Sequence, residues 1–268
     1  MVEDNDRWFE QVVSDLGDPQ NQRVWSVIVS VFGDLAQGSG DQLSGGALTR
    51  IVQPAGIRPE AMRVALHRLR KDGWIESGRS GRESMHRLTS FGRSQSAQVT
   101  PLIYARSATS PTRWHLVVAE DSQGNRALEE LLLSDAYVSL GRNIAMGSGS
   151  PPADITELMT LSFSDPQVPD WLKQRIFPDD LVQACRELKN AAERAGNSLV
   201  NRKKPNAMQI ATLRSLAIHR WRRVLLRHPD VPAAFFPADW TGPDCRRAIS
   251  DLLELLPRPE PAQLNRLT

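Results

Sequence analysis

Basic side chains with helical spacing are the residues of this chain whose types and positions could do chemistry. Arg63, His67, Arg70 and Lys71 recur three and four residues apart, so a helix over this stretch places them on one exposed face. A guanidinium group can donate two hydrogen bonds to the acceptors of guanine, and arginine and lysine both bind phosphate. The spacing therefore indicates a surface that binds nucleic acid.

The residues around this face predict the elements that position it. A helix is predicted over Ser44–Val52, with Ser44 as its N-cap, and Pro54-Ala-Gly56 ends it. Arg58-Pro59 begins a second helix. Its predicted buried stripe, opposite the basic face, consists of Met62, Ala65, Leu66 and Leu69.

Two short strands are predicted after the second helix, Trp74–Ser77 and Ser84–Leu88, joined across Gly78–Arg82. Helix, tight turn, helix and basic hairpin together are typical of a winged helix-turn-helix, in which the second helix enters a DNA major groove and the wing touches the neighbouring backbone. The alternative is a small helical hairpin with a solvated charged face, as most charged helix faces are.

Each basic residue receives a predicted role in binding double-stranded DNA. Arg63 and His67 are the candidates for contacts with base edges. Phosphate contacts, which position a protein without specifying sequence, are predicted for Arg58, Arg68 and Lys71. Arg79 and Arg82, in the predicted wing, are expected to touch the backbone or the minor groove.

The charge distribution supports this interpretation. The net charge of the 268 residues is only +2, yet residues 20–106 hold twelve basic and six acidic residues, whereas residues 1–19 hold one basic and six acidic residues. A module that faces phosphates requires such a local positive excess.

Other functional classes find less support in the sequence. The two cysteines, Cys185 and Cys245, form no metal-ligand pattern, so neither a zinc site nor a disulfide framework is indicated, and no cofactor is expected. No apolar run approaches the ~20 residues that span a bilayer, and residues 1–19 are acidic where a signal peptide is basic and then apolar. We expect a cytoplasmic protein that does not bind membranes.

The segments outside the predicted winged domain (residues 23–106) divide into four. Residues 1–22 form an acidic tail with one amphipathic helix, and a linker near Ser107–Pro111 precedes a middle domain over residues 112–177. Its strand-helix-strand-strand-helix-strand pattern predicts a ferredoxin-like fold. Residues 178–258 are predicted to be a helical domain, and residues 259–268 a disordered Pro-rich tail. The fold class is thus α+β.

Four sequence segments carry a resemblance to a known family: Trp25–Asp34, Arg63–Trp74, His86–Gly92 and, far along the chain, His219–Gly242. The last consists of a basic helix, a Pro-bracketed turn and a Pro-Ala-Asp-Trp segment. The chain resembles the PaaX family, transcriptional regulators of bacterial phenylacetate degradation, whose C-terminal signature is similar to that last segment. The segment between them departs from the family: its helix is short and acidic, where family members commonly have a longer and more basic one.

The resemblance implies a dimeric repressor with a winged helix, a ferredoxin-like middle similar to a small CRISPR-associated nuclease, and a helical C-terminal domain. It also implies release from operator DNA by phenylacetyl-CoA or a related aryl-acyl-CoA. The effector-binding residues stay open. Arginines near Trp221 could meet CoA phosphates, but we favour the alternative that Trp221 lies in the core and the arginines pair with acids.

Two other functions remain as alternatives. The pair Glu120-Asp121, after the first strand of the middle domain, could hold Mg²⁺ in a metal-dependent nuclease, although an Asp before a polar turn is more often a turn residue. His115, His219 and His228 have no Ser or Cys partner in a nucleophile motif, so no catalytic residue is assigned. A ligand-binding or scaffold protein without DNA binding is the third class, and the basic helix and wing argue against it.

Overall fold

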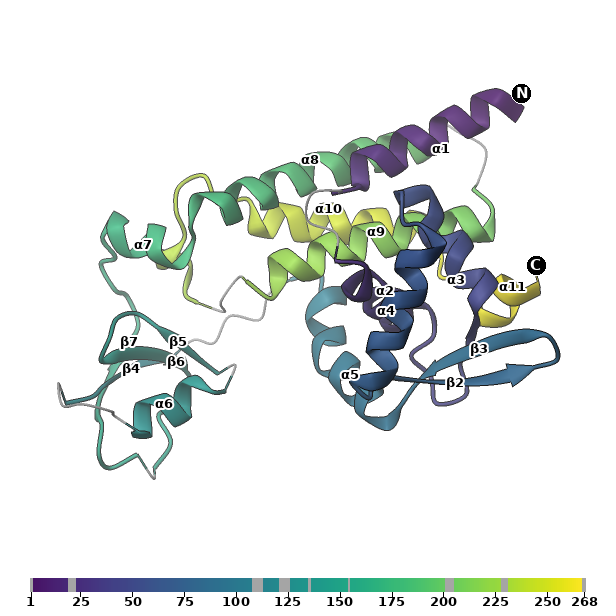
Figure 1. Ribbon diagram of the computed structural model, residues 1–268. Coiled ribbons are helices and arrows are strands. Elements are labelled where there is room, and N and C mark those ends of the chain that lie inside the picture. Colours follow the sequence, from purple (N-terminus) through teal and green to yellow (C-terminus); the bar gives the residue numbers. More distant parts are fainter. Residues whose placement is uncertain are drawn as a thin grey trace. The chain divides into compact units, whose positions relative to one another are not determined.

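The chain is a mixed α+β protein with N-terminal helices and a small sheet, a middle antiparallel sheet and a helical C-terminal region (Figure 1). The computed structural model describes residues 2–18, 23–107, 113–120, 126–134, 136–153, 155–200, 205–227 and 231–266. The chain forms two compact units. Unit 1 combines Met1–Ser107, Ala184–Leu225 and Thr241–Thr268, and unit 2 combines Ala108–Gln183 and Leu226–Trp240. The predicted division into consecutive domains stays a prediction.

Unit 1 is mostly helical. Its N-terminal elements are α1 (Val2–Leu16), α2 (Val24–Leu35), β1 (Leu43–Ser44), α3 (Gly45–Val52), the short 3₁₀ helix η2 (Gln53–Ala55), α4 (Pro59–Lys71), β2 (Ile75–Ser80), β3 (Glu83–Leu88) and α5 (Ser90–Tyr104). Its C-terminal elements are most of α8 (Asp179–Val200), then α9 (Ala207–Leu225), α10 (Gly242–Leu255) and α11 (Pro261–Arg266). The three strands form one antiparallel sheet in the order β1-β3-β2.

The turn between α3 and α4 has the predicted chemistry. The Ser44 hydroxyl accepts a hydrogen bond from the Ala47 amide at 3.0 Å and so caps α3. Gly56 ends η2 with φ of +79°, a conformation that a side chain disfavours. Pro59 then occupies the first turn of α4, and the predicted stripe from Met62 to Leu69 is buried.

The hairpin after α4 is longer than predicted. Strands β2 and β3 pair as far as Ser80 and Glu83, which leaves only Gly81 and Arg82 in the turn. Part of the segment predicted as a loop therefore belongs to the strands. Gly78 and Arg79 lie in β2 because the pairing with β3 satisfies their backbone groups, which composition alone does not show.

Helix α2 is the centre of unit 1. It is buried on several sides, as predicted, and packs against α4, α5 and α9. Its carboxylate Asp34 is fully buried and accepts two hydrogen bonds from Arg214 of α9, at 2.8 and 2.7 Å. Arg214 also donates to the carbonyls of Leu253 and Leu256, so this one ion pair connects three helices of both chain halves.

The C-terminal tail is ordered where disorder was predicted. Helix α11 begins at Pro261 and buries Leu264 in the same core as α2, α3 and α4. Asn265 accepts a hydrogen bond from the Ser44 amide at 2.8 Å and donates one to the Gln42 carbonyl at 3.0 Å. The prediction was wrong because Pro-rich composition indicates weak local structure but does not show a distant partner.

Unit 2 contains the middle sheet. Its elements are β4 (Trp114–Val118), α6 (Arg126–Leu132), β5 (Tyr137–Ser139), β6 (Ile144–Ser148), β7 (Met159–Phe163), α7 (Asp170–Ile176), η3 (Ala233–Phe235) and the start of α8. The four strands are antiparallel in the order β5-β6-β4-β7. Helix α6 packs on the side that carries Val117 and Ala145.

Two details of unit 2 differ from the prediction. Residues 149–153 and 155–158, between β6 and β7, contain no helix, so the predicted second helix of the pattern is not found there. Helix α7 was not predicted, because seven residues give too short a pattern. The predicted turn at Asp121–Gly124 and most of the predicted linker Ser107–Pro111 lie outside the described residues.

None of the helices in the described part of the chain is long and apolar enough to cross a membrane. The same part of the chain contains no group of three or more His, Cys, Asp or Glu side chains that could hold a metal ion. Cys185 and Cys245 are both buried, and a hydrogen bond between them is the main cause that lowers the pKa of Cys185.

Candidate functional site

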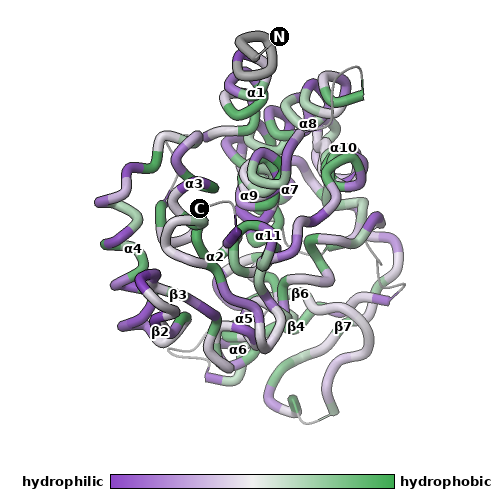
Figure 2. Tube along the Cα trace, turned by 90° about the vertical axis from the view of Figure 1, so that its right-hand side faces the viewer, coloured by the Kyte–Doolittle hydropathy of each residue, from purple (hydrophilic) through white to green (hydrophobic). Residues whose placement is uncertain are grey.

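The outward side of α4 is a ridge of four exposed side chains. A helix turns by about 100° per residue, so the buried stripe fixes which residues point away from the core. These are Glu60, Val64, His67 and Lys71. Figure 2 shows hydrophilic residues along α4 and on the hairpin beside it. Arg63 is exposed too, but lies on the flank of this ridge rather than at its crest.

The flanking basic residues of α4 have partners on their own helix. Arg63 pairs with Glu60 at 3.0 Å, and both side chains are largely exposed. Arg68 pairs with Asp72 at 3.4 Å, and its guanidinium lies 5.1 Å from the ring centre of Trp25. Exposed pairs of this kind contribute at most about 1 kcal/mol to stability, so each arginine can leave its carboxylate and bind another anion instead.

Four of the predicted binding residues are cations without a carboxylate partner among the described residues. They are Arg58, Lys71, Arg79 and Arg82, and all four side chains are exposed. Arg87 of the hairpin, in contrast, is neutralised by Glu76 at 2.8 Å. The uncompensated charge therefore lies at the start and end of α4 and at the hairpin tip.

A buried histidine holds the base of the hairpin. His86 of β3 lies 2.7 Å from the Ser77 hydroxyl on β2. Burial lowers the pKa of His86, and the charge of Arg70 lowers it further. A neutral imidazole at this position adds no charge of its own, and it fixes the hairpin beside α4. The sequence did not single out His86 as a structural residue.

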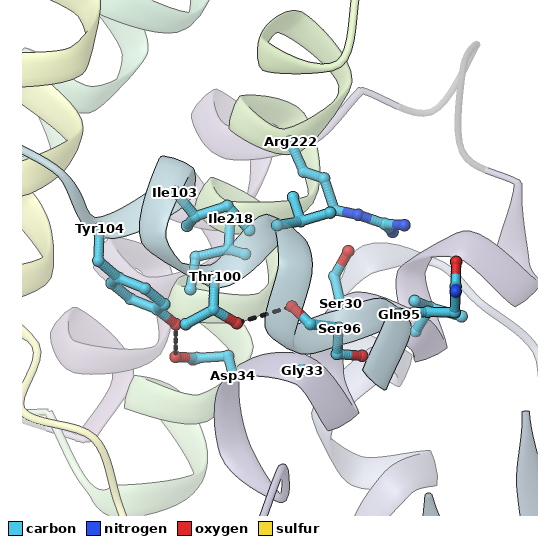
Figure 3. A pocket seen from close by; sticks show the side chains of 12 residues that line it. Ser30, Gly33, Asp34, Gln95, Ser96, Thr100, Ile103, Tyr104, Ile218 and Arg222 are labelled. Carbon is cyan, nitrogen blue, oxygen red and sulfur yellow. Dashed lines mark hydrogen bonds between the residues drawn. The ribbon is translucent and has the colours of Figure 1, made fainter. Parts of the chain in front are cut away.

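A second feature is a crevice between α2, α5 and α9 (Figure 3). Its volume is about 20 Å³, which is room for about one water molecule, so α2, α5 and α9 must separate before a larger ligand can enter. Val29, Val99, Ile103 and Ile218 give it apolar walls, and its polar lining includes Gln95, Ser96 and Arg222. The Ser96 hydroxyl is buried, and no described residue forms a hydrogen bond with it.

Arg222 differs from the other arginines of α9. Arg214, Arg220 and Arg223 each have a carboxylate or carbonyl partner, the last pairing with Asp18 at 2.6 Å. The described residues provide none for Arg222, and burial lowers the pKa of its guanidinium with no acidic neighbour to offset it. A partly desolvated cation without a counter-ion favours binding of an anion.

The rest of the Trp221 region is structural, which confirms the favoured interpretation for Trp221, Arg223 and Arg227, whereas Arg220 bonds backbone carbonyls and Arg222 has no acidic partner among the described residues. Trp221 is buried and donates its indole N–H to the Ile103 carbonyl at 3.2 Å. Arg246 lies over its ring at 5.1 Å. Arg227 pairs with Asp180 at 2.7 Å. Trp221 is thus not free to stack on a ligand.

The residues of the nuclease alternative do not form a site in the described part of unit 2. His115 is buried with Nδ1 3.0 Å from the Gly149 carbonyl and Nε2 3.0 Å from the Tyr137 hydroxyl. Since a carbonyl only accepts, Nδ1 donates and Nε2 accepts from Tyr137. Glu120 is exposed, whereas Asp121 and His228 lie outside the described residues.

Comparison with known families identifies the chain. Residues 23–92 match the profile of the family described as PaaX-like protein, and residues 179–263 match that of the PaaX-like protein C-terminal domain. The chain belongs to the PaaX-like family. The first match contains α4 and the hairpin, and the second contains α9 with Arg222. This PaaX-like protein thus carries α4 and the hairpin within a segment typical of its family, whereas the crevice also includes residues of α5 that lie outside both matches.

The chain is similar to two known proteins over most of their lengths. The PaaX-like chain is 24% identical over 255 residues to the transcriptional repressor PaaX of Escherichia coli, covering 85% of this chain and 79% of the repressor. It is also similar to the solved structure of the uncharacterized protein Rv0674 from Mycobacterium tuberculosis. That similarity has 19% identity and a TM-score of 0.48, and it covers 90% of this chain and 97% of the other.

Proposed function

We propose that this protein is a DNA-binding transcriptional repressor whose α2–β3 segment is a winged helix-turn-helix. The observation that carries the proposal is the uncompensated positive charge of Arg58, Lys71, Arg79 and Arg82 around an exposed helix. A helix about 10–12 Å in diameter fits the major groove, and the hairpin tip then meets the adjacent backbone. The distant similarity to a transcriptional repressor supports the same function.

We further propose that the protein acts as a homodimer. A two-fold dimer presents two copies of α4 to half-sites one or more helical turns apart. For the middle sheet we infer a ferredoxin-like fold that lacks its second helix, since the strand order β5-β6-β4-β7 and the antiparallel directions are those of that fold. We propose no catalytic activity for this sheet.

Fluorescence anisotropy on the gene's own upstream DNA tests the main proposal. We expect tight binding that weakens steeply with salt, because each neutralised phosphate contributes about 0.9 to the slope of log K against log salt. Removing both hairpin cations (Arg79→Ala with Arg82→Ala) should lower that slope, whereas Arg126→Ala on α6 provides a control. Binding that does not depend on salt would contradict the proposal.

The effector we propose is phenylacetyl-CoA or a related aryl-acyl-CoA. The family resemblance supports this ligand class, and the crevice offers apolar walls beside an unpaired guanidinium. Helix α2 packs against α4, so a ligand that separates α2 and α5 from α9 also changes the support of α4. Release then follows if the ligand binds this second arrangement better than the DNA-bound one.

Arg222→Met should abolish the response to the effector and leave operator binding unchanged. Methionine keeps the length and apolar stem of the side chain but removes its charge. Anisotropy of the protein–operator complex, titrated with phenylacetyl-CoA and separately with free phenylacetate, measures this. Arg126→Met, which changes an exposed arginine of unit 2, is the matched control. A full response of Arg222→Met would exclude the crevice as the effector site.

A further inference from the structure

Val64 is an exposed apolar residue at the crest of the basic helix. Its relative exposure is 70%, and no other large hydrophobic side chain between Gly45 and Leu88, all of which the structure describes, is exposed. On the ridge it lies between Glu60, one turn earlier, and His67 and Lys71 on the next two turns.

Neither local structure nor packing explains a valine there. Valine is a poorer helix former than alanine or the straight-chain polar residues, because its branched side chain loses rotamer freedom in a helix. The side chain faces away from the buried stripe, so it adds nothing to the core. Single exposed apolar side chains are common on protein surfaces, but this one stands at the centre of the basic ridge, where it is free to contact a ligand.

We propose that Val64 reads the 5-methyl group of a thymine in the major groove. This inference rests on the proposed DNA-binding function and assigns a base to one side chain. The major groove displays that methyl group as its only apolar feature, and apolar side chains recognise it by contact. Val64 is in the first half of α4, where a recognition helix contacts base edges.

The neighbours of Val64 fit this placement. Residues three and four apart on a helix have Cβ atoms about 5–6 Å apart, and successive bases rise by about 3.4 Å. Val64 and His67 therefore reach neighbouring base pairs, and Lys71, further along the ridge, approaches a phosphate. Recognition then combines one apolar contact, one imidazole and flanking cations, rather than relying on arginine alone.

Replacement of single thymines by deoxyuridine tests the proposal directly. This change removes only the methyl group, so anisotropy on a series of operators with one replacement each locates any methyl that the protein reads. We expect one thymine per half-site at which wild-type affinity falls about fourfold, the factor for one buried methyl-sized group. Val64→Ala should bind the thymine and deoxyuridine operators equally.

The Val64→Ala variant is expected to fold, because alanine is a better helix former than valine at an exposed site. Leu133→Ala, at another exposed apolar residue, is the control and should keep the wild-type pattern. The salt slope of Val64→Ala should match wild type, since no charge is removed. A substitution that only weakened DNA binding in general would lower the affinity for both operators and leave the difference between thymine and deoxyuridine intact.

The outcomes separate the two proposals. If wild type binds with a steep salt slope but no deoxyuridine replacement matters, or if Val64→Ala retains the sensitivity, the role of Val64 is overturned and DNA binding stands. If no salt-sensitive binding occurs at all, the proposed function itself fails. The inference is supported if wild type and Leu133→Ala bind less tightly when one particular thymine is replaced by deoxyuridine, and Val64→Ala does not.

Discussion

Arg63 and Arg79 contribute differently to DNA binding in the interface proposed here. Arg63 lies beside the ridge of α4 and can leave its exposed partner Glu60 to donate to a guanine. Arg79 is in the hairpin, where a backbone phosphate is the expected partner.

Arg63→Ala should reduce the preference for operator over unrelated DNA by roughly 5- to 150-fold, as expected for loss of a good base contact worth about 1–3 kcal/mol. Arg79→Ala should instead weaken binding to all sequences about equally and lower the salt slope by about 0.9. Competition anisotropy with operator and random DNA measures both effects. If Arg63→Ala prefers operator over random DNA as strongly as wild type does, Arg63 does not contact a base, and only the ridge residues do.

His219 makes the stability of unit 1 depend on pH. Burial, with smaller contributions from the charges of Arg223 and Arg222, lowers its pKa from an ordinary 6.5 to about 4. Above pH 6.5 the ring is neutral in both the folded and unfolded states. Below it the unfolded chain takes up a proton that the folded protein does not, so stability falls as the pH decreases from 6.5 to 4.

This single group should account for about 3 kcal/mol of destabilisation between pH 6.5 and pH 4. His219→Gln, which cannot be protonated, should show a flatter dependence of the unfolding free energy on pH, whatever its stability at pH 7. Urea unfolding followed by tryptophan fluorescence at several pH values measures this. If the unfolding free energy of His219→Gln depends on pH as that of wild type does, the folded protein protonates His219 as readily as the unfolded chain.

At the level of elements, α4 could be predicted almost completely and α11 not at all. The buried stripe of α4 follows from residues three and four apart, and Pro59 and Gly73 mark its limits. The same stripe, followed around the helix, also identifies Val64, which a search for basic residues overlooks. For α11, six residues with two prolines nearby carry no periodic signal, and its order comes from Leu264 and Asn265 contacting residues more than 200 positions away.

Asn265→Ala should destabilise unit 1 by about 1–3 kcal/mol, because the Ser44 amide loses its acceptor in a buried position. The effect should appear in urea unfolding, and operator affinity should fall if β1 shifts. Gln263→Ala, an exposed change in the same helix, should be neutral. Equal stabilities of the two variants would show that α11 does not hold β1.

At the level of the whole molecule, unit 1 is built from three separate chain segments. Short-range patterns predicted most helices of these segments, α11 excepted, but not how the segments pack together. The bidentate pair between Asp34 and Arg214 joins residues 180 positions apart, and no spacing rule relates them. The middle sheet was easier to predict, since its strands follow one another closely along the chain.

A fragment of residues 1–107 should therefore not behave as an independent DNA-binding domain. It contains α2 to α5 but lacks α9, whose Ala211 packs in the same core, and it lacks Arg214 as partner of the buried Asp34. We expect at least tenfold weaker operator binding than the full chain, with poor near-UV dichroism, since a buried charge without its partner costs about 3–5 kcal/mol. Supplying residues 184–268 as a second fragment should restore both, and a well-folded, fully active fragment would contradict this account.

The composition of unit 1 also has a consequence for synthesis. After Ser107 is added, the ribosome needs roughly 6–24 seconds to reach Leu225, the end of α9, at typical bacterial and eukaryotic rates of about 5–20 residues per second. Until then the side of α2 that contacts α9 is exposed on the nascent chain. The proposed DNA-binding surface therefore folds only after α9 has been made, so we expect a stop codon before α9 to yield an inactive product rather than a truncated competitor for the operator.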